Sequence, residues 1–159
     1  MLNATVSKLL NEQINKEMYS AYLYLDMANF YVNKGLNGFA NWFNKQAKEE
    51  MEHALKFMHY LQDNGFEVSL ESIAKPALSY KELREPLVES LNHEVYVTAS
   101  INNIYAEAMK VHDYRTMEFL HWFIEEQGEE EKNANELIVD FDWHYPNGLF
   151  AMDAKLSSR

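Results

Sequence analysis

Four long segments of the sequence place carboxylates, and in one case a histidine, where apolar residues are otherwise expected. Within each segment apolar residues recur at alternating spacings of three and four, which is typical of a helix with one buried face. Polar residues interrupt this buried face at least once in every segment. The interruptions that can bind metal are Glu17, Glu50, His53, Glu94, Gln127 and Glu130.

These interruptions lie at similar distances from the turns that join the segments in pairs. Glu17 precedes the turn at Gly35 by about as many residues as Glu50 and His53 follow it. The polar residues of the third and fourth segments are placed in the same way about a turn expected near residue 112. Because antiparallel helices face each other at equal distances from their turn, each pair should meet at one level. The pattern predicts a single polar layer.

Buried carboxylates in one layer need a positive partner. Four ionised glutamates that converge repel one another, and burying each of them is costly unless a cation lies between them. Two divalent cations would neutralise the four charges. Carboxylates with one imidazole suit iron or manganese, and the trivalent ion binds carboxylates still better. The residues therefore predict a site that binds a pair of metal ions and favours their oxidation.

The elements that position these residues are expected to be helices. The chain has only five Gly and three Pro among 159 residues, and they cluster between the segments. The stretch from about 84 to 142 is too long for one ordinary helix and should break near 111–114, with Asp113 as the N-cap of the following helix. The other helices are expected at about 5–33, 38–63 and 149–156.

The expected fold is all-α. No useful strand alternation or internal repeat is found. The connection from residue 64 to about 84 can span up to about 66 Å when extended, whereas a 28-residue helix is about 42 Å long. We therefore predict one domain over residues 1–159: a four-helix bundle with a long crossover between its second and third helices and a short fifth helix.

Composition excludes several classes of function. With 14 Lys and Arg against 25 Asp and Glu, the formal net charge is −11, which disfavours nucleic acid as a partner. The chain has no Cys, so a disulfide framework, a thiolate zinc site and an iron–sulfur cluster are excluded. No apolar run is long enough for a transmembrane helix, and the first twenty residues do not resemble a signal peptide. We expect a cytoplasmic protein with no membrane partner.

Five motifs resemble those of the ferritins, specifically the prokaryotic non-haem type, in order and spacing. They are LLNEQINKEMYSAYLYL (9–25), EEMEHA (49–54), NHE (92–94), FIEEQGEEE (123–131) and GLFAMDAKL (148–156). The resemblance implies a ferroxidase centre in which Glu17, Glu50 and His53 bind one iron ion. A second iron ion would be bound by Glu50, Glu94 and Glu130 with Gln127 nearby, so that Glu50 bridges the two.

The resemblance implies further features around that centre. A third iron site would use Glu49, Glu126, Glu129 and Glu130, and Tyr24 would hydrogen-bond a ligand or give up an electron. Fe(II) would be oxidised by dioxygen or peroxide. Family members assemble as a hollow shell of 24 subunits that stores ferric oxyhydroxide, so the chain is expected to be an iron-storage ferritin with ferroxidase activity.

Two other functions stay open on the sequence. One is a non-storage di-iron oxidase or peroxidase of the rubrerythrin or bacterioferritin type, although the absence of Cys excludes the rubredoxin module of rubrerythrins. The other is a helical interaction bundle whose inward glutamates only set the register. A storage protein should form a particle near half a megadalton and bind iron, whereas these alternatives should not do both.

Some residues are expected to lie outside the site. Glu118 and His121 repeat the E-x-x-H spacing, but they miss the buried face and should lie on the surface. Met51 occupies the place of the axial haem ligand of bacterioferritins, yet the fourth helix lacks the second E-x-x-H, so no haem is expected. The remaining histidines off the buried face should be structural: His59, His93, His112 and His144.

Three departures from the ferritin pattern bear on the fold. Gly128 lies inside the fourth helix, where Gly costs roughly 1 kcal/mol relative to Ala, and could loosen it beside the third iron site. The linker at residues 140–148 looks short and leaves the position of the fifth helix open. Pro86 requires its helix to begin within about four residues before it.

Overall fold

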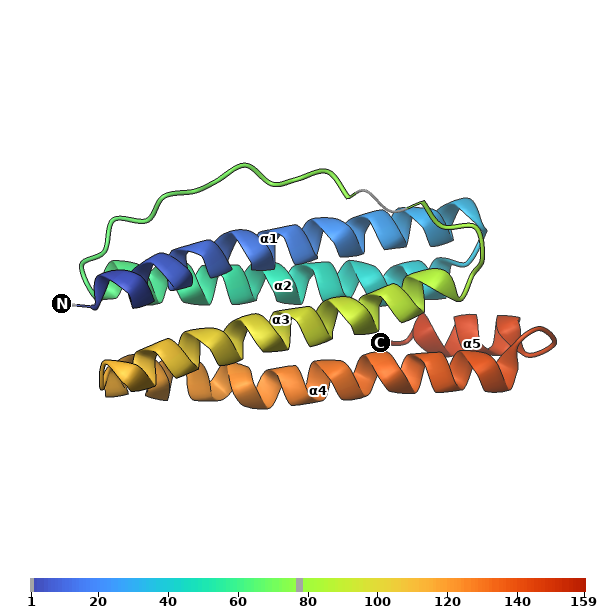
Figure 1. Ribbon diagram of the computed structural model, residues 1–159. Coiled ribbons are helices and arrows are strands. Elements are labelled where there is room, and N and C mark those ends of the chain that lie inside the picture. The colour runs from blue at the N-terminus through green and yellow to red at the C-terminus, as the bar shows by residue number, and fades with distance from the viewer. Residues whose placement is uncertain (1, 77–78) are drawn as a thin grey trace.

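The computed structural model describes residues 2–76 and 79–159, which form a bundle of four long helices with a fifth short one (Figure 1). This confirms the predicted all-α class and the predicted break near residue 112. No helix among the described residues is long and apolar enough to cross a membrane. The helices are α1 (Ala4–Asn33), α2 (Asn37–Asp63), α3 (Glu85–Lys110), α4 (Tyr114–His144) and α5 (Leu149–Leu156).

Short turns join the long helices into two hairpins, α1 with α2 and α3 with α4 (Figure 1). Gly35 ends the first helix with a φ of 75°, a left-handed conformation that glycine adopts without steric cost. In the second hairpin the carboxylate of Asp113 accepts a hydrogen bond from the Thr116 N–H at 3.1 Å. Asp113 is thus the N-cap of α4, as its position in the sequence predicted.

The connection between α2 and α3 runs along the outside of α1 from one end of the bundle to the other (Figure 1). The Asn11 side chain donates to the Ser69 carbonyl at 2.9 Å and accepts from the Ser69 N–H at 3.0 Å. Farther along, the Tyr31 hydroxyl donates to the Leu83 carbonyl at 2.7 Å. The long crossover is therefore confirmed, and Pro86 lies in the first turn of α3, where proline is tolerated.

The short linker still allows α5 to pack against α2 and α4. Leu36, the N-cap residue of α2, offers no side-chain acceptor to the first amides of the helix. The Asp153 carboxylate on α5 fills that role, accepting from the Gly38 N–H at 2.8 Å and the Phe39 N–H at 3.0 Å. The first turn of α2 is therefore capped by a residue more than a hundred positions away in the sequence.

Two apolar clusters fill the bundle, one at each end, and the predicted polar layer lies between them. On α1, Val6, Leu10 and Ile14 belong to one cluster, whereas Leu23 and Tyr31 belong to the other. Glu17 lies between these two groups along the helix. The other three long helices show the same order of apolar, polar and apolar segments. Apolar side chains on both sides thus enclose the acidic residues.

Candidate metal centre

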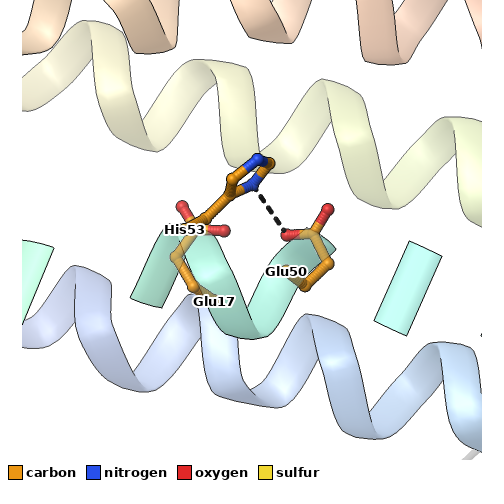
Figure 2. A group of neighbouring side chains, drawn as sticks. All are labelled: Glu17, Glu50 and His53. Carbon is orange, nitrogen blue, oxygen red and sulfur yellow. Dashed lines mark ion pairs between the residues drawn. The ribbon is translucent and has the colours of Figure 1, made fainter. Parts of the chain in front are cut away.

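The polar residues predicted to converge do so at the middle of the bundle. Each of the six is at most 4% exposed: Glu17, Glu50, His53, Glu94, Gln127 and Glu130. Ligand atoms of Glu17, Glu50 and His53 lie within 4.8 Å of one another. Figure 2 shows these three side chains, Glu17 extending from α1 and the other two from α2.

A second group of ligand atoms shares Glu50 with the first. Carboxylate oxygens of Glu50, Glu94 and Glu130 also lie within 4.8 Å of one another. Glu94 is carried by α3 and Glu130 by α4, so the two groups together draw on all four long helices. Because Glu50 has two carboxylate oxygens, it is placed to bridge two cations.

Amide side chains orient two of the carboxylates. Gln13 donates to Glu17 Oε1 at 2.9 Å, and Gln46 donates to Glu130 Oε2 at 2.8 Å. Both amides are buried, Gln13 completely. Hydrogen bonds of this kind hold a ligand in one orientation before the metal arrives.

Glu94 is oriented by two donors. The Tyr24 hydroxyl donates to Glu94 Oε1, and the Gln127 amide donates to Glu94 Oε2 at 3.1 Å. The Tyr24 hydroxyl therefore contacts one of the clustered carboxylates, and its role in the chemistry stays a prediction. In this arrangement Gln127 uses its nitrogen to position Glu94.

Several buried polar atoms of these side chains have no hydrogen-bond partner. Among the described residues, four buried side-chain atoms have no hydrogen-bond partner, and three of them are Glu17 Oε2, Glu50 Oε1 and His53 Nδ1. His53 Nδ1 lies 3.5 Å from the other carboxylate oxygen of Glu50, Oε2. An unpaired buried polar atom is costly and rare. Carboxylate oxygens and an imidazole nitrogen are ligands that suit iron, so the unsatisfied atoms fit a bound iron ion.

The carboxyl groups are set up to exchange protons for cations. Burial raises the pKa of Glu17 and Glu50 well above the ordinary value of 4.5, and repulsion from neighbouring carboxylates raises both further. Burial also raises the pKa of Glu94 and of Glu130 to about 7. Without a cation these groups bind protons more readily than exposed carboxyl groups do, and a metal ion that binds them displaces the protons that they hold.

The residues expected at a third iron site are only partly brought together. Glu126 Oε1 lies 3.8 Å from His53 Nε2, and a group of ligand atoms joins these two residues to Glu130. Glu129 is exposed. Glu49 pairs with Arg159, whose Nη2 lies 3.0 Å from its carboxylate. The third site with all four glutamates stays a prediction.

The structure also adds neighbours of the site that the sequence did not indicate. His93 was placed outside the buried face, yet it is buried, with its Nε2 2.6 Å from the Ser20 hydroxyl and its ring packed edge-on against Tyr24. Burial lowers the pKa of His93 to about 4, so its ring is neutral. Gln13 could have been found from its position one turn before Glu17. No local signal marks Arg159.

The surface position predicted for the second E-x-x-H is confirmed. Glu118 and His121 are both exposed, so the second E-x-x-H takes no part in the site. The helix α4 continues without interruption through Gly128, where an added Cβ would meet no atom within 4 Å.

Comparison with known sequences finds relatives that match most of this chain. A family model that describes a ferritin-like domain matches residues 7–142. The chain is 36% identical over 160 residues to a probable bacterial non-heme ferritin-like protein of Haemophilus influenzae, which covers 99% of this chain and 97% of the relative. It is 36% identical over 155 residues to a bacterial non-heme ferritin of Campylobacter jejuni, covering 96% of this chain and 93% of that one.

Comparison with solved structures extends the likeness to the fold. An open-pore ferritin of the archaeon Archaeoglobus fulgidus superposes with a TM-score of 0.97 at 34% identity, covering 99% of this chain and 98% of that one. A humanized archaeal ferritin superposes with the same TM-score at 35% identity, covering 100% and 99%. The likeness therefore extends over nearly the whole length of the chain.

Proposed function

The chain belongs to the ferritin family, and from this premise we propose that it stores iron after oxidising it. Fe(II) is the substrate, and the buried centre made by Glu17, Glu50, His53, Glu94 and Glu130 binds two Fe(II) ions. The Fe(III) that forms then moves to a ferric mineral enclosed by many copies of the chain. We propose the cytoplasm as the place of this storage.

Two irons in one centre match the electron count of the reaction. Each Fe(II) gives up one electron, so a pair supplies the two electrons that reduce dioxygen to hydrogen peroxide or hydrogen peroxide to water. The chain contributes ligands and their orientation. Glu50 bridges the two ions, and the amides of Gln13 and Gln46 hold the terminal carboxylates in place. The apolar clusters on either side exclude water from the centre.

The single observation that carries this proposal is the shared position of Glu50. It belongs to both groups of ligand atoms, and one of its oxygens is buried without a hydrogen-bond partner. A glutamate that served only the fold would have its oxygens paired or exposed to water.

Aerobic addition of Fe(II) tests the proposal. We expect the wild-type protein to develop the ultraviolet absorbance of Fe(III). Glu50→Ala or His53→Ala should slow that rise by at least about tenfold, because the centre then lacks one of its ligands. The fold should be kept, because both apolar clusters stay intact. Glu118→Ala and His121→Ala are matched controls, since they make the same changes in the exposed E-x-x-H. Unchanged oxidation kinetics in Glu50→Ala would contradict the assignment.

The proposed third iron site and the shell are finer parts of the same proposal. We propose that iron leaving the centre passes by Glu49, Glu126 and Glu129, with Glu130 shared between this site and the centre. The exposed position of Glu129 and the partial exposure of Glu126 support a route from the buried centre toward solvent. Electron microscopy after iron loading tests whether mineral collects inside a closed particle.

A further inference from the structure

Arg159, which follows α5, reaches across to the face of α2 beside the centre. Its Nη2 donates to both carboxylate oxygens of Glu49, at 3.1 and 3.0 Å, and to Gln46 Oε1 at 2.6 Å. Its Nη1 donates to the Trp42 carbonyl at 3.1 Å, and the guanidinium carbon lies 4.1 Å from the centre of the Trp42 ring. Lys45 donates to the main-chain oxygen of Arg159. The guanidinium is thus held on several sides.

One amide connects this guanidinium to the metal centre. The oxygen of Gln46 accepts from Arg159, and its nitrogen donates to Glu130 Oε2 at 2.8 Å. Gln46 is 5% exposed, so solvent does not compete strongly for either bond. Because the two ends of an amide have opposite hydrogen-bonding character, Arg159 at the oxygen keeps the nitrogen directed at Glu130.

We propose that Arg159 is a positioning residue that controls how long iron stays at the third site, by occupying Glu49 until a metal ion displaces it. This inference rests on the proposed function, because Glu49 matters to iron only if iron leaves the centre past it. The guanidinium neutralises Glu49 in the iron-free protein. An arriving ion must compete with it for the same two oxygens.

The physical basis is a competition between two cations. One guanidinium nitrogen, Nη2, contacts both oxygens of Glu49 while Nη1 binds the Trp42 carbonyl. A point-like ammonium group cannot reach these acceptors together. A third metal ion near Glu126 and Glu130 gains Glu49 as a ligand only when Arg159 leaves. Arg159 therefore weakens binding of the third ion without touching Glu17, Glu50 or His53. A weakly held ion moves on to the mineral sooner.

Anaerobic titration with Zn(II), followed by calorimetry, tests this inference on the iron-free assembled protein. Zn(II) has no redox chemistry and accepts carboxylate and imidazole ligands. We expect two tightly bound ions per chain and a third, weaker one in the wild type. In Arg159→Gln the third ion should bind about five- to tenfold tighter, as expected for loss of one partly exposed competing charge. The ion bound by Glu17, Glu50 and His53 should stay within about twofold. Arg159→Lys should lie between the wild type and Arg159→Gln.

Two controls separate this role from a general effect of charge or of fold. Arg84→Gln removes a guanidinium that pairs with Asp142 instead of a site carboxylate, and should leave all three affinities unchanged. In a Glu49→Gln background, adding Arg159→Gln should not tighten binding of the third ion further. If Arg159→Gln fails to assemble, the comparison between Arg159→Lys and the wild type decides, because Lys keeps the charge but lacks the planar guanidinium.

Crystals soaked in Zn(II) give a readout independent of affinity. In wild-type crystals with the third ion bound, the guanidinium should have left Glu49. Three outcomes would each overturn this inference and leave the proposed function untouched. They are equal third-ion affinity in the wild type and Arg159→Gln, no third ion in either protein, and zinc on Glu49 with Arg159 still bound to it. Failure to bind the first two ions would instead overturn the proposed function.

Discussion

At the scale of single residues, the centre contains more carboxyl groups than a protein interior can hold in ionised form without a bound cation. Glu94 and Glu130 each have a pKa of about 7, raised by burial from 4.5. In an unfolded chain both would titrate near the ordinary value. The folded iron-free protein therefore binds more protons than the unfolded one throughout the interval between these values.

This difference predicts how the stability of the iron-free protein depends on pH. A pKa that is raised in the folded state stabilises the folded protein at pH values below the pKa of the unfolded state. That contribution is lost as pH rises from about 4.5 through about 7. Each of the two groups accounts for roughly 3 kcal/mol over this window. As pH rises from 5 to 8, we expect the urea midpoint of the iron-free wild type to decrease. The midpoint of Glu130→Gln should decrease less. Identical pH profiles for the two proteins would contradict the prediction.

Tyr24 gives a second prediction at this scale. Tyr24→Phe removes the hydroxyl that donates to Glu94, while Gln127 remains bound to the other oxygen. Metal binding should therefore persist, but Fe(II) oxidation should slow several-fold because Glu94 is less well oriented and a phenol is lost. Stopped-flow absorbance measures the rate, and Zn(II) stoichiometry checks that the site is intact. Tyr22→Phe, the same change at an exposed position of α1, should have no effect.

At the scale of elements, α5 is held in place by its contact with the start of α2. The Asp153 carboxylate caps the first turn of α2, and the backbone of Asp153 lies against Gly38. A Cβ added at Gly38 would lie 1.7 Å from the Asp153 carbonyl oxygen. Such an overlap with backbone requires the two helices to separate, and α5 leads directly to Arg159 beside the centre.

Two glycine substitutions should therefore act in opposite directions. Gly38→Ala should destabilise the protein by at least about 2 kcal/mol, since it forces backbone apart in a packed region. Gly128→Ala should stabilise it by roughly 0.5–1 kcal/mol, since Gly128 lies mid-helix with open space around it. Urea denaturation of the iron-free proteins measures both. Equal effects of the two substitutions would show that the α5 contact does not constrain Gly38.

At the scale of the whole molecule, one chain contains all the clustered side chains of the candidate centre, but a single helical bundle cannot enclose a mineral. Large apolar side chains stay exposed on it, among them Trp143 at 84% and Phe150 at 82% near the α4–α5 turn. Exposed apolar patches of this kind are typical of surfaces that contact other chains. The chain is therefore expected to work as a closed homo-oligomer.

The size of the particle separates storage from the alternatives. Twenty-four copies of an 18.7 kDa chain make a particle of about 450 kDa. We expect light scattering to give this mass and electron microscopy to show a hollow shell that fills with density after iron loading. A dimer that oxidises Fe(II) without retaining it would favour a non-storage di-iron oxidase.

The sequence determined the helices and the inward position of the acidic residues. Helical periodicity is a local property, so the residues that share the buried face of α1 with Glu17 could be assigned from their spacing alone. The polar layer followed because short turns force each hairpin into register. Asp113 as the N-cap of α4 likewise depends only on neighbours along the chain.

Only the tertiary structure decided which distant groups meet around that layer. His93 escaped detection because α3 packs against more than one neighbour, so its buried face is wider than a single row of positions. The contact of Asp153 with the first turn of α2 and that of Arg159 with Glu49 each join residues more than a hundred positions apart. Their contacts depend on where α5 packs, which no local spacing encodes, because a helix as short as α5 takes its position from the surface that it covers.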